Sequence, residues 1–455
     1  MSGERMRDQF LVFGRPVIGE DEIAEVVESL RSGWIGTGPK VQRFEQMLAD
    51  YLDVPHARCV SSCTAALMLG LRSLGVGPGD EVIVPAMTFI ASANAVEHVG
   101  ATPVFVDSVP GTGLLDLAAA EDAITPRTKA IMPVHLSGRP VDMDALNALR
   151  DRHGLAVIED AAHAIGAEWR GTRIGGHGNL TAFSFYVTKN ITTIEGGALT
   201  TTTEEIAERV ERLALHGLSL GAWERFSDKG YRHYEVEEPG FKFNMTDVQA
   251  SLGLHQLPRL DQWIDARERL WRSYDEMLRG LPLETPPEAV DMRHARHLYQ
   301  VLVSPSAGRT RDQLMGFLTQ RRIGVGVHYR ACHLHPFYRD KYQLDRGALP
   351  VATDMSERSL SLPLSADLCE DDLLDVPRAL GHGGAQPSLS ARPTTIRRLA
   401  DPLRVRCANN MRISGAGRAA PALSPARRRW SAAPRTRPSR SAPSRIIAPR
   451  RRWSV

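Results

Sequence analysis

The first half of the chain alternates between two kinds of hydrophobic pattern. Short runs of apolar residues, typical of buried strands, are separated by stretches of about ten residues in which apolar positions recur at helical spacing. Such alternation is typical of βαβ units around a mainly parallel sheet, so we expect an α/β fold. The expected strands are 57–60, 81–84, 103–107, 129–133, 155–159, 181–187 and 198–202.

Two helices are expected before the first strand. The segment 20–31 has the helical pattern and is followed by Gly33, which ends it. A glycine-rich loop, 34–39, leads to a second amphipathic helix at 40–51. The apolar positions of the first helix are Ile23, Val26, Val27 and Leu30.

The last third of the chain predicts a second, smaller α/β domain that ends near residue 381. We expect a large domain at 1–250, a small domain at 251–381 and a tail at 382–455. The elements expected after residue 204 are helices at 204–215, 244–254, 311–321 and 371–380, a helix continuing to about 278, and strands at 298–303, 325–329 and 360–364.

The tail differs sharply in composition from the rest. Residues 382–455 contain 17 Arg, no Lys and one acidic residue, whereas the whole chain has a net charge of only +3. Its Pro, Ser, Ala and Gly content and its lack of hydrophobic periodicity predict disorder. A basic arm for nucleic acid is one interpretation. We favour the other, an extension without a selected function such as a shifted reading frame in a GC-rich gene.

Bulk composition points to a soluble protein. No segment approaches the roughly 18 apolar residues that a membrane span needs, and the N-terminus has no apolar signal segment. We therefore expect a cytoplasmic protein without a membrane partner. The five cysteines form no CxxC pair, which predicts free thiols and no metal site.

Polar residues follow several of the expected strands. In parallel sheets ligands gather at the carboxyl ends of strands, and five sites lie there: 61–64, 88–89, His135, Asp160 and Lys189. Lys189 has two interpretations. It is either a loop lysine that reaches solvent or a desolvated amine that forms a Schiff base with a carbonyl cofactor.

One cofactor accounts for these residues together. Pyridoxal phosphate needs a lysine, an anion site, a carboxylate opposite the pyridine nitrogen and flat groups over its ring. Asp160 can supply the carboxylate, His163 a contact to the phenolic oxygen, and Phe89 and Ala162 the two faces. The hydroxyl-rich start of the helix after residue 60 can hold the phosphate, although it also fits an ordinary helix N-cap.

These segments resemble the DegT/DnrJ/EryC1/StrS family of PLP-dependent nucleotide-sugar aminotransferases. The resemblance covers roughly residues 10–381 in order, which makes it specific. Cys63 stands where many relatives have glycine, and the tail has no counterpart. The motifs are Trp-Ile-Gly-Thr-Gly-Pro at 34–39, Ser-Cys-Thr-Ala-Ala-Leu at 62–67, 85–95, Glu-Asp-Ala-Ala-His at 159–163, 184–190 with 195–197, 244–250 and His-Tyr at 328–329.

The resemblance implies the fold and the roles of individual residues. It implies PLP-dependent transferase fold type I, aspartate aminotransferase-like, with Lys189 as the catalytic Schiff-base lysine. The other implied cofactor contacts are Thr64, Ala65 and Ser184 to the phosphate, Asp160 to the pyridinium, His163 to O3′, Phe89 to the ring, and Asn244 of the neighbouring subunit to the phosphate. The implied substrate contacts are Thr37, Tyr186, Arg225, His328 and Tyr329.

The implied reaction is transfer of an amino group from L-glutamate to a nucleotide-linked keto-deoxysugar. Relatives with histidine in place of the lysine dehydrate sugars instead, and here Lys189 is intact. The segment 328–330 resembles the branch that acts at C4, and amination at C3 stays open. Asn244 implies a homodimer with shared active sites. The alternative class is a non-catalytic regulator or sensor that keeps the fold and the pocket.

Overall fold

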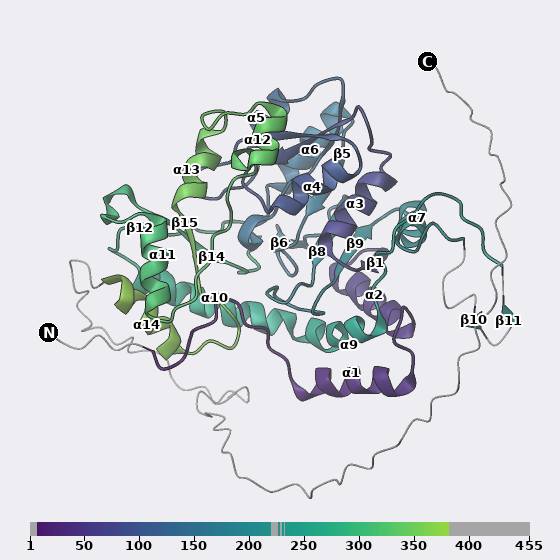
Figure 1. Ribbon diagram of the computed structural model, residues 1–455, viewed down its shortest axis with the longest axis horizontal. Coiled ribbons are helices and arrows are strands. Elements are labelled where there is room, and N and C mark those ends of the chain that lie inside the picture. Colours follow the sequence, from purple (N-terminus) through teal and green to yellow (C-terminus); the bar gives the residue numbers. More distant parts are fainter. Residues whose placement is uncertain (1–6, 220–225, 228–229, 232, 382–455) are drawn as a thin grey trace, which may run out of the picture. The chain divides into compact units, whose positions relative to one another are not determined.

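The computed structural model describes residues 7–219, 226–227, 230–231 and 233–381, all within one compact unit (Figure 1). Its central element is a seven-stranded sheet in the order β1-β9-β8-β5-β4-β2-β3. The pairs from β3 to β8 are parallel, whereas β9 runs antiparallel to both of its neighbours. The strands are β1 (His56–Val60), β2 (Glu81–Pro85), β3 (Thr102–Val106), β4 (Thr128–Ile131), β5 (Ala156–Asp160), β8 (Leu180–Ser184) and β9 (Gly197–Thr201).

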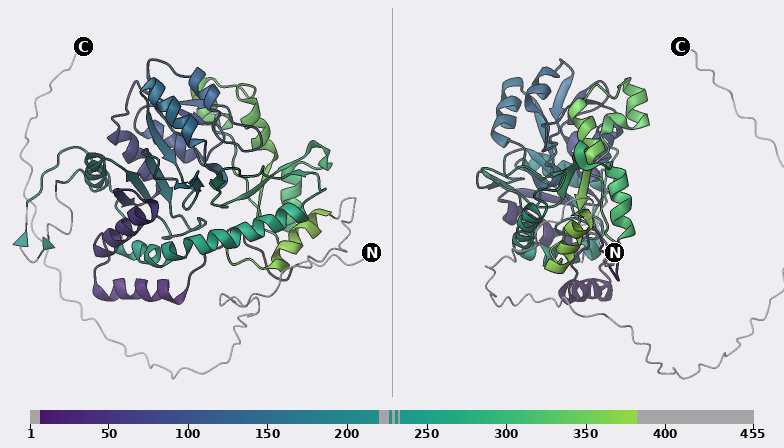
Figure 2. Two further views of the ribbon diagram at one scale, coloured as in Figure 1. Left: turned by 180° about the vertical axis from the view of Figure 1, so that it is seen from behind. Right: turned by 90° about the vertical axis from the view of Figure 1, so that its left-hand side faces the viewer.

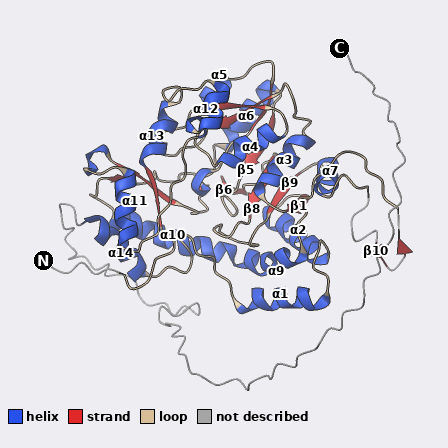
Figure 3. Ribbon diagram, viewed as in Figure 1, coloured by secondary structure: helices blue, strands red, loops and turns tan. Residues whose placement is uncertain are grey.

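Helices cover both faces of this sheet and surround its strands (Figure 3). On β2, Val82 and Val84 enter the core beneath α3, α4 and α7, while Ile83 enters the opposite core beneath α2, α6 and α9. A strand buried on both faces must be apolar throughout, which explains its continuous apolar run. The helices are α2 (Pro39–Leu52), α3 (Cys63–Ser73), α4 (Ile90–His98), α5 (Leu117–Asp122), α6 (Met143–His153), α7 (Glu204–Ala214) and α9 (Asp247–Gln256).

The remaining chain builds a smaller antiparallel sheet in the order β12-β14-β15. α9 and α10 run almost in line along one side of the molecule (Figure 2). The expected domain boundary at residue 250 falls inside α9, which spans Asp247–Gln256. The elements are α10 (Leu260–Met277), β12 (Leu283–Glu284), β14 (Tyr299–Val303), α11 (Arg311–Gln320), α12 (Pro336–Tyr342), α13 (Pro350–Arg358), β15 (Ser359–Leu362) and α14 (Glu370–Gly381). Short pairings involve β6 (Glu168–Trp169), β7 (Thr172–Arg173), β13 (Met292–Arg293), β10 (Phe226–Ser227) and β11 (Gly230–Tyr231).

Two expected elements differ in the structure. The strand expected at 325–329 is absent, because only Gly326 makes a single bridge, to Ser361. The strand expected at 181–187 ends at Ser184, where the chain leaves the sheet to form the loop that carries Lys189. Among the described helices, none is long and apolar enough to cross a membrane.

α1 (Glu20–Ser32) forms as expected but turns its polar side inward. Glu22 and Ser29 are buried, whereas Ile23 and Leu30 are 47% and 58% exposed. An apolar stripe normally faces the core. Here two of the four apolar positions, Ile23 and Leu30, are exposed instead.

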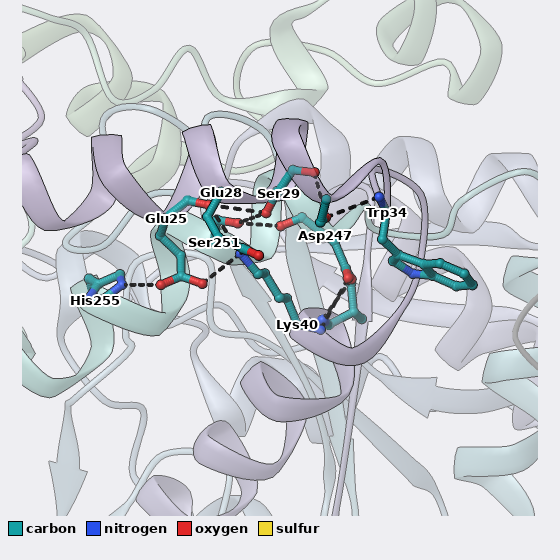
Figure 4. A network of polar contacts seen from close by, with 10 residues as sticks. Glu25, Glu28, Ser29, Trp34, Lys40, Asp247, Ser251 and His255 are labelled. Carbon is teal, nitrogen blue, oxygen red and sulfur yellow. Dashed lines mark hydrogen bonds and ion pairs between the residues drawn. The ribbon is translucent and has the colours of Figure 1, made fainter.

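Polar contacts hold the inward side of α1 against α2 and α9 (Figure 4). Lys40 Nζ lies 2.6 Å from Glu25, whose carboxylate also lies 3.0 Å from His255 Nε2. Ser29 Oγ lies 2.7 Å from Ser251 Oγ. α1 is therefore fixed to its own chain by hydrogen bonds and ion pairs.

Candidate active site

A cavity of about 480 Å³ opens where the carboxyl ends of the parallel strands meet. Its wall takes residues from the segments that follow β1, β2, β4, β5 and β8, and from the turn before β9. The position is where open α/β sheets bind ligands, and the volume suits a small organic molecule. The predicted site residues that line it are Thr64, Phe89, Asp160, His163, Ser184, Tyr186, Lys189, His328 and Tyr329.

Lys189 reaches into this cavity from the loop between β8 and β9. Burial lowers the pKa of its amine to about 8, and nearby Cys63 and Asp160 offset part of that effect. Within the described residues its Nζ has no hydrogen bond or ion pair. Because the amine lines the cavity and is desolvated, the solvent-facing interpretation of Lys189 does not fit the structure. Its neutral form, which dominates above about pH 8, is the form that attacks a carbonyl carbon.

Asp160 ends β5 and is held by neighbouring donors. Its Oδ2 accepts a 2.7 Å hydrogen bond from Ser92 Oγ, and its Oδ1 accepts one of 3.1 Å from the Ala162 N–H. Ser92 is fully buried and lies 2.8 Å from the Thr88 hydroxyl. This chain of hydroxyls fixes the carboxylate and keeps it satisfied inside the protein.

The hydrogen bonds of His163 determine which of its nitrogens carries the proton. Its Nδ1 accepts the Ser137 N–H at 3.2 Å, so the proton lies on Nε2, which donates to Tyr329 Oη at 3.0 Å. Burial holds the pKa of His163 well below its ordinary value, and burial also raises the pKa of Tyr329. The two rings thus form a neutral pair in which the phenol keeps its own O–H for another acceptor.

The turn at the start of α3 forms the expected anion site in part. Ser62 Oγ caps the helix by accepting the Ala65 N–H at 3.1 Å, so that N–H is occupied and Ala65 does not line the cavity. The preceding N–H groups of the first turn have no intrahelical partner and lie beside the Thr64 hydroxyl. A Cβ on Gly197 would lie 2.4 Å from the backbone of Ser62, so this close approach requires glycine.

Other predicted residues lie outside the cavity. Asn244 Nδ2 donates to Thr37 Oγ1 at 2.7 Å, and neither residue lines the cavity of its own chain. His135 is fully buried behind the sheet, where its Nε2 contacts Glu159 at 3.0 Å. Arg225 lies outside the described residues.

The structure adds residues that sequence reasoning missed. Ser92 lies within a quoted motif, and its helical spacing from Thr88 was the available signal. The His297 ring packs against His163 at a tilt, with ring centroids 4.5 Å apart, and Phe13 stacks against His328 at 5.3 Å. No local pattern marks these two, because they come from segments far from the motifs.

The arrangement fits pyridoxal 5′-phosphate. The cavity brings together an amine with a lowered pKa, a fixed carboxylate, an anion-binding helix start, and Phe89 with Ala162 to enclose a ring. When bound, this cofactor supplies an electron sink for a carbanion. Lys189 can hold the aldehyde carbon and then carry a proton, while Asp160 can face the pyridine nitrogen.

An α/β fold with this site is that of a PLP-dependent aminotransferase, and comparison with known proteins agrees. The model of the DegT/DnrJ/EryC1/StrS aminotransferase family matches residues 16–381. The spore coat polysaccharide biosynthesis protein SpsC of Bacillus subtilis (strain 168) is 47% identical over 377 residues, 82% of this chain and 97% of SpsC.

Solved structures show the same likeness. S. venezuelae DesV has a TM-score of 0.73 and 40% identity over 80% of this chain and 94% of its own. The PLP form of the putative sugar aminotransferase Spr1654 from Streptococcus pneumoniae has a TM-score of 0.76 and 36% identity over 82% and 97%. This chain belongs to the DegT/DnrJ/EryC1/StrS aminotransferase family, and its cofactor is pyridoxal 5′-phosphate.

Proposed function

We propose that this aminotransferase moves an amino group from L-glutamate onto the keto carbon of a nucleotide-linked deoxysugar, at C4. The observation that carries the proposal is Lys189, an amine with a pKa of about 8 in the same cavity as Asp160. Similarity to SpsC and to Spr1654, named for polysaccharide biosynthesis and sugar amination, supports a sugar substrate. The choice of C4 rests on the resemblance of the segment 328–330 to the branch that acts at C4, and His328 and Tyr329 of that segment line the cavity.

Each cavity residue has a proposed task. Lys189 holds the cofactor and then moves a proton between the cofactor and the amino-bearing carbon. Asp160 keeps the pyridine nitrogen protonated, and His163 with Tyr329 contacts the phenolic oxygen. Thr64 and Ser184, with the start of α3, bind the phosphate.

The proposed substrate contacts surround the same opening. Tyr186, His328 and Tyr329 contact the amino donor or the sugar, and Thr37 does so from the 34–38 loop. Arg225 is proposed to contact the nucleotide diphosphate, where an arginine fork suits phosphate.

The proposed active unit is a homodimer. Asn244 is held by Thr37 outside its own cavity, so a role at the phosphate requires a second subunit. The exposure of Ile23 and Leu30 on α1 supports such a partner, because exposed apolar side chains that lie together mark interaction surfaces.

Mixing inactive subunits tests the shared sites. If Lys189 and Asn244 of one subunit serve different active sites, a heterodimer of one Lys189→Ala subunit and one Asn244→Ala subunit contains one intact site. Random mixing then restores about one quarter of wild-type activity, since half the dimers carry one good site of two. Absence of recovery in confirmed heterodimers would show that the two residues serve the same subunit.

A panel of nucleotide keto-sugars with glutamate tests the reaction itself. The expected product carries the amino group at C4, located by NMR, and Lys189→Ala yields none. A C3 product would assign the enzyme to the other branch. Cofactor-loaded protein that aminates no keto-sugar in the panel would favour the regulator instead.

A further inference from the structure

A second cavity, of about 200 Å³, lies on the far side of the loop that supports His163. It is separate from the Lys189 cavity, and among the described residues only Leu298 lines both cavities. Its wall includes Ser137, Arg139 and the segment 284–287.

Arg139 is a buried cation without an acidic partner. Its side chain belongs to a residue only 7% exposed, and its guanidinium contacts the Pro287 carbonyl and, at 3.9 Å, the sulfur of Met292. Within the described residues no carboxylate pairs with it. The only acid in the cavity wall, Glu284, is paired with Arg358.

Such a cation is costly to bury alone. Burial and the nearby Arg296 hold the pKa of Arg139 below its ordinary value. The guanidinium has five N–H donors, of which the two contacts above use two. Donors therefore remain for a ligand in the cavity that this residue lines.

His294 adds a neutral donor to the same wall. It is 4% exposed, and its Nδ1 accepts the Arg296 N–H at 2.9 Å, so the proton lies on Nε2. Its ring packs on Trp271 with centroids 5.0 Å apart, which fixes its orientation. A fixed N–H beside an unpaired guanidinium is a donor set for an anion.

We propose that this cavity binds a small oxyanion, a carboxylate or a phosphate, on Arg139. A ligand there would act on the catalytic cavity through the loop between them. The Ser137 N–H fixes His163. Gln300 Oε1 accepts a hydrogen bond from Ser137 Oγ, and Gln300 Nε2 donates to the His328 carbonyl at 2.7 Å. Gly138 packs so closely that a Cβ would lie 2.8 Å from the His163 carbonyl oxygen. The cavity is thus an accessory site built against the wall that holds His163.

Calorimetric titration of the cofactor-loaded protein tests this site, because PLP then occupies the catalytic anion site. Inorganic phosphate and acetate are titrated at constant ionic strength, with chloride as the reference. Saturable binding of phosphate alone, or of acetate alone, would identify the kind of oxyanion. Arg139→Gln is expected to weaken that binding about tenfold or more, since a charge-assisted hydrogen bond is lost.

Two further variants keep the test decisive. Arg170→Gln removes a surface charge paired with Asp144 and should leave the binding unchanged. If Arg139→Gln does not fold, Arg139→Lys replaces it, because lysine keeps the cation. Arg139→Lys should bind the oxyanion more tightly than the double variant Arg139→Lys/His294→Leu. Absence of saturable binding to the wild type, or equal binding by Arg139→Gln, would overturn the proposal. Neither result depends on the sugar reaction.

Discussion

Replacing Gly197 by alanine perturbs the contact between β9 and the turn that starts α3. The added Cβ would lie 2.4 Å from Ser62 C, 2.5 Å from Cys63 N and 2.7 Å from Phe183 O. All three are backbone atoms, which cannot rotate away as a side chain can. β9 is also paired on both sides at this residue, so the strand itself has little freedom to move.

The expected cost lies at the upper end of overpacking, about 3 kcal/mol. For a domain of this size the melting temperature of the apoprotein should fall by roughly 4 °C, from the per-residue entropy of unfolding. Because the turn carries the N–H groups that face the phosphate, PLP affinity should also fall, by about tenfold or more. Thermal denaturation and a PLP absorbance titration measure the two effects.

A second glycine provides the control. Gly316 lies within α11, and a Cβ there would meet nothing within 4 Å. Gly316→Ala should therefore stabilise the protein by about 0.5–1 kcal/mol, as in other helix interiors. If Gly197→Ala melts and binds PLP like the wild type, the tight approach of β9 to the turn is not what holds the phosphate site.

Three further outcomes follow from the site and from α1. Ser92→Ala should lower the free energy of unfolding by about 2 kcal/mol, because the buried carboxylate of Asp160 loses a donor; an unchanged denaturant midpoint would contradict this. Lys189 has a pKa lowered to about 8, so its amine is neutral above that pH and protonated below it. The rate at which apoprotein takes up PLP should accordingly rise with pH through about 8, and a rise delayed to the ordinary lysine range would contradict the desolvation. If the proposed homodimer forms through α1, Leu30→Glu should shift it toward monomer in light scattering; a dimer that persists in this variant would exclude α1 from the interface.

The strands of the sheet could be predicted because their burial is visible in short, local runs of apolar residues. β2 and β8 are buried on both faces, so their runs of apolar residues identify them without knowledge of their neighbours. Asp160 ends such a strand and Lys189 follows one, so their position at the cavity could be predicted for the same reason. The segment 325–329 has a similar run but lies outside the ladder, where only one bridge forms.

Other features depend on contacts that no local pattern contains. Asn244 and Thr37 lie 207 positions apart, and their hydrogen bond exists only in the folded chain. Arg139 is one arginine among many in the sequence, and only the folded structure shows that it is buried without a carboxylate. The periodicity of α1 predicted a helix correctly, but it could not show which side of the helix its own chain covers.

The inverted orientation of α1 has a consequence for assembly. In the proposed homodimer, separating this helix from α2 and α9 would expose charged and hydroxyl groups to water, whereas separating it from a neighbouring subunit would expose Ile23 and Leu30. Salt screens the ion pairs of the first set, though only partly because they are half-buried, and it does not screen apolar contacts. In such a dimer, added salt would therefore weaken the attachment of α1 to its own chain more than its apolar contact with the neighbouring subunit.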